Sequence, residues 1–506
     1  MSEVYFRSTP RKPQPQKDTD AGRRILGILT PSAAAALAAA VSLMGALTLN
    51  AVNGWGLGGA GAVTLCIFIG AVWFWIFSTV EDTYVALGAA VALVISGILP
   101  AEGLFAALGE DTIWLLMAAF VIANAVSSTG LAARGAAFLI SGARSLRQLA
   151  YLSCLGLVVT AFAIPATSGR AALALPIFLT LRKVLHDRPV AVKMLAVLFP
   201  TVILLSAVSS FLGAGAHLIT SQILQAAGFS GFDFASWLLL GLPLGLAASF
   251  IATELVIRLF TDRAERRAPL RIEMGALRQG SVQRLSGPLD LDEQRSLLLL
   301  CAVVALWCTE PIHGLDPAIV ALVGALVVCL PAYGSVNLGA ALKKVPWSML
   351  IFMAATLALG SSLVSTGAAD WLAASILAPV QSLGAARPYV FVAVVVLAST
   401  AAHLVIQSRS ARSAVLIPVI VAAAGPMGVD PVAAAFASTA AAGFCHTLTS
   451  SAKPVAIFAA TNGQPNYEPA DLLRLSAWLA PLNAALVLLF SFVVWPVLGL
   501  PLFLQS

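Results

Sequence analysis

Two short polar segments, each in the middle of a long apolar stretch, carry the side chains best suited to bind a ligand. The first is Ala-Thr-Ser-Gly-Arg at 166–170, inside the apolar stretch 148–183, and the second is Ser-Arg-Ser-Ala-Arg at 408–412, inside 388–424. An arginine in such a stretch is costly without a partner, and its planar guanidinium can bind a carboxylate through two parallel hydrogen bonds. Serine and threonine hydroxyls can donate further hydrogen bonds. The two segments therefore predict a site for a small anion.

The composition indicates that these segments lie in a lipid bilayer. Of the 506 residues, 59% are hydrophobic and 10% are charged, whereas charged residues make up about a quarter of a soluble domain. Many apolar runs have about 18 to 25 residues, enough to cross a bilayer as a helix. Strand-like alternation is absent, so helices are expected to do the spanning. The six cysteines show no metal-ligand spacing, and no metal or cofactor is expected.

The apolar runs predict an all-α integral membrane protein with 11 transmembrane helices. The two stretches that hold the polar segments are too long for one crossing, so each is expected to form a re-entrant hairpin whose half-helices meet near the bilayer midplane. Backbone N–H groups at the start of such a half-helix attract an anion. The predicted spans are 32–49, 57–78, 83–99, 112–128, 192–212, 234–260, 296–310, 316–334, 347–364, 431–449 and 471–498.

Basic residues between the spans indicate the orientation in a cell membrane, with a bacterial inner membrane as the expected location. The net charge of +6 could suggest a nucleic-acid partner, but arginine and lysine lie in short segments between spans, so no nucleic acid is expected. Under the positive-inside rule the N-terminus is cytoplasmic and the C-terminus lies outside. The expected regions are a cytoplasmic tail (1–30), an extra first span (31–56), a first repeat (57–260), a cytoplasmic linker (261–295) and a second repeat (296–506).

A weak internal repeat relates the two halves. Met-Ala-Ala at 117–119 and Ser-Thr-Gly at 128–130 recur at 353–355 and 365–367, and a polar segment follows at a similar interval in each half. By the count of spans the first repeat enters from outside and the second from inside, which places the first hairpin on the cytoplasmic side and the second on the outer side. Inverted five-span repeats of this kind support alternating access.

These features resemble the divalent-anion/sodium symporter family, which has a Ser-Asn-Thr motif at the tip of each of two hairpins. Residues 166–168 and 408–410 occupy the motif positions here, and neither segment contains asparagine. The family also has a broken helix after each hairpin that helps to hold sodium, and its counterparts are 213–217 and 450–454. The resemblance covers nearly the whole chain from the second span onward and is more topological than literal.

Basic residues stand where the family has neutral side chains. Arg170 and Arg412 replace the usual threonine after each motif, and His217 and Lys453 stand at or beside the missing asparagines of the broken helices. Sodium needs oxygen ligands without a fixed cation nearby, because like charges about 4 Å apart repel by roughly 1 to 4 kcal/mol. The same cations can instead pair with substrate carboxylates. The expected substrate ligands are Thr167, Ser168, Gly169, Arg170, His217, Ser408, Arg409, Ser410, Arg412 and Lys453.

Each of these residues also has a structural alternative. Arg170 and Arg412 could pair with hairpin carbonyls or with Glu254, and Lys453 could extend to a nearby surface. The hydroxyl groups could cap the half-helices of the hairpins. Two further histidines, His403 and His446, are more typical of satisfied interior side chains than of substrate ligands.

The clustered cations also predict how transport is coupled. An empty site lined by unpaired cations is costly to occlude, whereas a bound dianion neutralises it. The expected function is therefore sodium-independent antiport of small organic dianions such as succinate, malate or tartrate against a counter-substrate. The resemblance implies a homodimer in membrane lipid that works by an elevator-type movement. A sodium- or proton-coupled symporter is the alternative, and an intramembrane enzyme is the rival from another class, although no His-Glu-x-x-His or Gly-x-Ser-x-Gly pattern occurs.

Overall fold

The computed structural model describes most of the chain and is built from helices, as predicted. Nine helices in the described part are long and apolar enough to cross a membrane. The expected tail 1–30 lies outside the described residues, as do residues 273–286 of the expected linker. The described residues are 37–46, 48, 56–270, 272, 287–331, 334–377, 383–461 and 463–504.

The first half places a helix in every span that the sequence predicts there. The helix at 37–46 covers the middle of the first predicted span. Two short helices, α5 and α7, were not expected from the sequence. The elements that follow are α3 (Gly59–Phe77), α4 (Asp82–Ile95), α5 (Ala101–Leu108), α6 (Asp111–Thr129), α7 (Leu131–Ile140), α8 (Leu146–Ala163), α9 (Thr167–Val184), α10 (Pro189–Leu205), the 3-10 turns η1 (Ser206–Ser209) and η2 (Phe211–Gly213), α11 (Gly215–Ala226), α12 (Phe234–Phe260) and α13 (Arg263–Arg267).

Part of this order recurs in the second half. In the first half, the helix pair α8 and α9 is followed by an interrupted helix (α10 and α11) and then by the long helix α12. The second half has the pair α21 and α22, followed by an interrupted helix (α23 and α24) and then by the long helix α25. Its elements are α15 (Leu291–Cys308), α16 (Glu310–His313), α17 (Pro317–Val328), α18 (Leu338–Leu342), α19 (Trp347–Ser365), α20 (Ala368–Leu377), α21 (Arg387–Ala401), η4 (Ala402–Leu404), α22 (Arg409–Ala424), η5 (Gly425–Met427), α23 (Pro431–Ala441), α24 (Lys453–Ala459), the antiparallel pair β1 (Ala460–Thr461) and β2 (Gln464–Pro465), α25 (Pro469–Leu489), the π-helical η6 (Phe490–Val494) and α26 (Trp495–Val497).

Helix α15 begins earlier than predicted because its first turn has a capping box. The Asp290 carboxylate accepts a hydrogen bond from the Glu293 N–H at 2.8 Å, and Glu293 accepts one from the Asp290 N–H at 2.9 Å. Glu293 is also buried against Arg134 of α7, with 2.7 Å between Oε2 and Nη1. This ion pair joins the start of the second half to α7 in the middle of the first.

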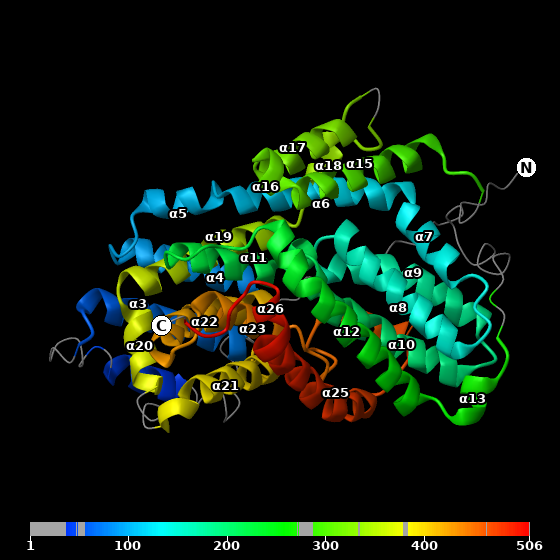
Figure 1. Cartoon of the computed structure of the whole chain (residues 1–506). Coiled ribbons are helices and arrows are strands. Elements are labelled where there is room, and N and C mark those ends of the chain that lie inside the picture. Colours follow the sequence, from blue (N-terminus) through cyan, green and yellow to red (C-terminus); the bar gives the residue numbers. More distant parts are fainter. Residues whose placement is uncertain are drawn as a thin grey trace, which may run out of the picture.

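Helices from the two halves pack against each other throughout the molecule. Helix α6 packs on α17 and α4 packs on α19, and in Figure 1 α15 to α18 lie along α6 near the top of the view. The hairpin of α8 and α9 packs on α10 and α12, while α22 of the second hairpin packs on α11 and α23. Both hairpins therefore contact an interrupted helix.

The break between α10 and α11, which together form the first interrupted helix, is stabilised by contacts with the long helix α12. Trp237 of α12 is fully buried and donates from Nε1 to the Val208 carbonyl at 2.9 Å, inside the break. Gly241 and Gly245 allow this close approach, because an added Cβ would lie 2.1 Å from the Val208 carbonyl oxygen and 2.0 Å from the Ser209 hydroxyl. The break spans 206–214, slightly before the predicted 213–217.

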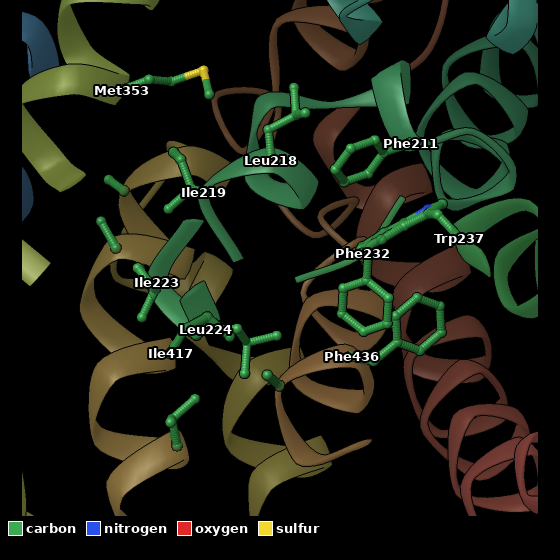
Figure 2. Packing of buried hydrophobic residues seen from close by; sticks show 14 of the residues in the cluster. Phe211, Leu218, Ile219, Ile223, Leu224, Phe232, Trp237, Met353, Ile417 and Phe436 are labelled. Carbon is green, nitrogen blue, oxygen red and sulfur yellow. The ribbon is translucent and has the colours of Figure 1, made fainter. Parts of the chain in front are cut away.

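An aromatic cluster fills the space next to this break. Figure 2 shows the rings of Phe211, Phe232, Trp237 and Phe436 close together, and the centroid distances from Trp237 to the other three rings are 5.4, 5.1 and 4.8 Å. Phe436 comes from α23, so the cluster connects the interrupted helices of both halves. The rings of Phe232 and Phe436 pack edge to face on Trp237, an arrangement that aromatic rings favour.

Candidate functional site

A cavity of about 1370 Å³ lies between the two hairpins and the helices α4, α6 and α19. Ser168 and Gly169 line it from the first hairpin, and Ser408 and Ser410 line it from the second. Lys453, the first residue of α24, is exposed on the same wall. Five of the predicted ligands, which are far apart in the sequence, therefore share one cavity.

The tip of the first hairpin is a sharp turn with an unusual backbone. Ala166, directly before α9, has a φ of 69°, a left-handed conformation that costs a non-glycine residue about 1 to 3 kcal/mol. Its N–H donates to the Leu212 carbonyl at 3.4 Å, which ties the tip to the break after α10. Among the described residues no side chain caps α9, so the N–H groups of its first turn suit an anion.

The tip of the second hairpin is capped by a side chain. The Ser408 hydroxyl accepts a hydrogen bond from the Ala411 N–H at 3.3 Å, as the structural alternative for these hydroxyls expects. Ser410 lies beside the start of α11, since a Cβ added at Gly215 would come within 3.1 Å of its hydroxyl.

Arg170 lies outside the cavity, fully buried behind the first tip. Its Nε donates to the Thr160 hydroxyl at 3.0 Å and its Nη1 to the Ile203 carbonyl at 2.9 Å. Its Nη2 donates to the Leu157 carbonyl at 2.6 Å and to the Ser206 hydroxyl at 2.7 Å. The guanidinium thus anchors α9 to α8 and to the break after α10. This is the structural alternative, in which Arg170 pairs with carbonyl groups and does not face a substrate in the cavity.

Arg412 has the corresponding position in the second half. It is fully buried outside the cavity, and its Nη1 donates to the carbonyls of Ala442 at 2.9 Å and Phe444 at 3.4 Å, both in the break after α23. Its Nε and Nη2 have no hydrogen-bond partner among the described residues. Each of the two arginines therefore joins a hairpin to the interrupted helix of its own half.

Arg409 connects the two hairpin tips. Although it is the first residue of α22, its Nη2 donates to the Thr167 hydroxyl at 3.0 Å and its Nη1 to the Leu204 carbonyl at 3.4 Å. None of the ion pairs in the described residues includes Arg409. The positively charged Arg409 side chain of the second hairpin therefore lies at Thr167 of the first hairpin, next to the cavity-lining Ser168.

His217 is a buried residue of α11 that does not line the cavity. Its ring stacks on Trp237 with 4.6 Å between centroids, and its Nδ1 lies 3.0 Å from the Ser210 carbonyl oxygen. The side chain therefore belongs to the packing around the break. His217 is thus packed as an interior histidine, the environment that the sequence predicts for His403 and His446.

Lys453 is positioned by contacts on the far side of α24. The Tyr467 hydroxyl donates to the Val455 carbonyl at 2.5 Å, and burial raises the pKa of Tyr467, so this donor keeps its proton. Arg182 at the end of α9 hydrogen-bonds the Thr461 hydroxyl and the Gln464 side chain, which fixes the β-hairpin after α24 to the first hairpin. Lys453 itself forms no ion pair among the described residues.

The cavity also contains charged residues that sequence reasoning did not select as ligands. Glu81 and Asp82 lie at the start of α4, and Lys183 and Lys344 lie on the walls that lead away from the tips. The two lysines occur in segments that the positive-inside rule had identified as cytoplasmic. The sequence gives no indication that Glu81 and Asp82 line a cavity, because they precede a predicted span and belong to no motif.

Comparisons with known proteins agree over nearly the full length. The family model described as "Sodium:sulfate symporter transmembrane region" matches residues 32–501. A "Membrane protein" of Cupriavidus necator is 24% identical, over 96% of this chain and 90% of the relative. The "Sodium-dependent dicarboxylate transporter SdcS" of Staphylococcus aureus is 23% identical, over 86% of this chain and 85% of the relative.

Two further matches extend this result. The "Putative malate transporter YflS" of Bacillus subtilis is 23% identical, over 60% of this chain and 64% of the relative. Among solved structures, the YdaH transporter of Alcanivorax borkumensis matches with a TM-score of 0.50 and 16% identity, over 87% of this chain and all of that chain. At this identity the structural match speaks for the fold alone.

Proposed function

The chain belongs to the sodium:sulfate symporter family, and from this premise we propose that it is a secondary transporter of small organic dianions such as succinate, malate or tartrate. The observation that carries this proposal is the one cavity shared by both hairpin tips, with Ser168, Ser408, Ser410 and Lys453 on its walls. Hydroxyls and an ammonium group are the donors that a dicarboxylate needs. Relatives named as dicarboxylate and malate transporters support this substrate class.

The topology that goes with this function has 11 spans and two re-entrant hairpins in inverted repeats. It is supported by the presence of a helix in each predicted span and by the shared order of hairpin, interrupted helix and long helix in the two halves. With a cytoplasmic N-terminus, Lys183 and Lys344 lie at the cytoplasmic end of the cavity. The described conformation is then open to the cytoplasm, and an elevator-type movement of the hairpins, within a homodimer, exposes the site to the other side.

Sodium independence is proposed because Arg409 brings a fixed positive charge to the first tip. Its guanidinium is bound to Thr167, which stands where the family has the asparagine of its motif. A cation at this place repels sodium and attracts a carboxylate. Thr167, Ser168, Gly169, Ser408, Arg409, Ser410 and Lys453 are proposed as substrate ligands, whereas Arg170, Arg412 and His217 are proposed to hold the tips in place.

Sodium-coupled symport is the second candidate. It is favoured by the name of one relative, a sodium-dependent dicarboxylate transporter that aligns over 86% of this chain. A proton-coupled carrier that uses Glu254 has less support, because this carboxylate lies outside the cavity and is bound by Arg147, Arg258 and the Tyr151 hydroxyl.

The test is a transport assay with the purified chain in liposomes. Vesicles loaded with succinate, and empty vesicles as the control, receive labelled succinate in sodium or choline buffer. Antiport predicts uptake into loaded vesicles only, at equal rates in the two buffers. Sodium-dependent uptake into empty vesicles would establish symport instead, and a lack of uptake with succinate, malate and tartrate would exclude the dicarboxylate class.

A further inference from the structure

We propose that an anionic phospholipid binds where α8, α12 and α13 meet, with its phosphate among a group of arginines and an acyl chain along α8. A second pocket, of about 560 Å³, lies there and shares no lining residue with the substrate cavity, so this inference goes beyond the proposed function. The pocket is lined by Arg147, Glu254, Arg258, Arg263, Arg266 and Arg267.

Helical spacing brings these side chains together, because residues four positions apart share one face of a helix. Glu254 and Arg258 have this spacing near the end of α12, and Arg263 and Arg267 have it in α13. Both α12 and α13 pack on α8, which contributes Arg147. In Figure 1 α13 lies at the edge of the molecule, beyond the end of α12. Three helices therefore surround the pocket.

Glu254 is the carboxylate of the pocket, and it already has three partners. It accepts hydrogen bonds from Arg147 Nη2, from Arg258 Nε and from the Tyr151 hydroxyl, each at 2.8 Å. These bonds orient the two arginines, whose side chains remain 56% and 68% exposed. Because a guanidinium has five N–H donors, Arg147 and Arg258 both keep donors for an anion.

The arginines of α13 add charge that the protein leaves unpaired. Arg263 and Arg267 are exposed and form no side-chain hydrogen bond or ion pair within the described part of the chain, and Arg266 uses its Nε for the Asp262 carbonyl at 3.0 Å. The nearby acids Asp262 and Glu265 do not line the pocket. The pocket is therefore strongly positive, and phosphate oxygens are acceptors that arginine binds well.

An apolar strip continues from the arginines along the outer side of α8. Arg147, Tyr151, Leu155 and Val159 follow one another at intervals of four residues, so they lie along one side of the helix. The Arg147 guanidinium lies 5.8 Å from the centre of the Tyr151 ring, and Leu155 and Val159 are exposed. Phe250 of α12 stacks on Tyr151 with 5.8 Å between ring centroids and widens the strip.

This order of groups fits a phospholipid better than a free phosphate. Both α8 and α12 are long and apolar enough to cross a membrane, and Arg147 and Arg258 lie near the ends of these helices, where lipid headgroups are found. A basic pocket between membrane helices at this depth attracts anionic headgroups. An acyl chain attached to such a headgroup would cover Leu155 and Val159, whereas inorganic phosphate would use the arginines alone.

The experiment follows thermal unfolding of the purified full-length chain in detergent, by tryptophan fluorescence, while phosphatidylglycerol is added. The midpoint of the wild type is expected to rise by about 3 °C or more, because a ligand of the folded state stabilises that state. Phosphatidylcholine and inorganic phosphate at the same concentrations should leave the midpoint unchanged. Without lipid, the midpoint of every variant below should equal that of the wild type.

A double variant tests the arginines directly. For Arg263→Gln with Arg267→Gln, the concentration of phosphatidylglycerol that gives half of the rise should be about tenfold higher or more, because two charged hydrogen-bond donors are lost. The matched control removes two exposed basic side chains outside the pocket, Arg144→Gln with Lys343→Gln, and should respond like the wild type. Arg263→Gln alone is the second variant if the double variant does not fold.

The outcomes separate the lipid from other ligands and from the proposed function. An equal rise with inorganic phosphate overturns the lipid, because a free phosphate then suffices. No rise in the wild type, or an equal loss of response in the control variant, overturns the site. Succinate exchange by the double variant should equal that of the wild type, since the pocket lies outside the cavity. A wild type that fails to exchange succinate would contradict the proposed function and not this site.

Discussion

The Nη2 of Arg409 donates a hydrogen bond to the Thr167 hydroxyl at 3.0 Å, although 242 positions separate the two residues. This bond joins the first residue of α22 to the first residue of α9, so the two hairpin tips are in direct contact. A substrate held between the tips lies next to a charge that the second hairpin contributes to the first.

Replacing Arg409 is expected to impair transport strongly. A hydrogen bond to a charged group contributes about 1.5 to 3 kcal/mol, so Arg409→Gln should reduce succinate exchange by about 10- to 100-fold. Arg409→Lys should not restore it, because one ammonium group cannot replace the planar fork that reaches both Thr167 and the Leu204 carbonyl. Exchange by Arg267→Gln, in the exposed helix α13, is the control; near-normal exchange by Arg409→Gln would contradict the proposed role.

Arg170 is expected to matter for folding rather than for binding. Its four hydrogen bonds lie inside the protein, and Arg170→Met would remove all four, each of which contributes about 1.5 to 3 kcal/mol as a hydrogen bond to a charged group. The variant should show a clearly lower midpoint of thermal unfolding in detergent, followed by tryptophan fluorescence, while Arg267→Met should not. A variant with a normal midpoint and no succinate binding would instead make Arg170 a substrate ligand.

Lys453 should show the opposite behaviour. Its side chain is exposed to the cavity and has no ion-pair partner among the described residues, so Lys453→Gln should leave the thermal midpoint unchanged. The KM for succinate should rise about tenfold or more, because the lost ammonium contributes a charged hydrogen bond. Initial exchange rates over a range of succinate concentrations measure this, with Lys343→Gln as the control. An unchanged KM would remove Lys453 from the site.

Two neighbouring lysines allow a test of electrostatic attraction at the end of the cavity. Lys344 lines the cavity and Lys343 does not, although both are exposed. Lys344→Gln should slow uptake at low ionic strength, and the difference from the wild type should shrink as salt is added, because salt screens the attraction. Lys343→Gln should behave like the wild type under the same conditions. Equal effects of the two variants would show that only the overall surface charge matters.

The helices could be predicted from the sequence because apolar length is a local property. In the stretches 148–183 and 388–424, where polar interruptions predict re-entrant hairpins, the structure has two pairs of helices, α8 with α9 and α21 with α22. The sequence predicts that both tips line one site, because irregular backbone near the bilayer midplane is tolerated only where it is buried in protein or lines a wet cavity. The hydrogen-bond partners of Arg170 and Arg412 are set by the tertiary structure, so the sequence could not predict them.

Helical phase explains why Arg170, although it was predicted to be a substrate ligand, does not line the cavity in this structure. Gly169, Leu173 and Pro176 line the cavity, whereas Arg170 and Ala174 lie on the opposite, buried side of α9. A residue one position after a cavity-lining residue is turned about 100° around the helix axis. The motif indicates that an arginine is near the tip, but only the rotation of the helix decides which side it faces.

The size of the cavity has a consequence for inhibition. Its volume of about 1370 Å³ exceeds the roughly 300 to 1,000 Å³ of a pocket that encloses a drug-sized molecule, so a four-carbon diacid would fill only part of it. A compound with a dicarboxylate head and a bulky apolar tail can therefore fill the wall of Phe120, Ile140 and Phe352 and keep the hairpins from moving. Such a blocker would act from one face of the membrane only.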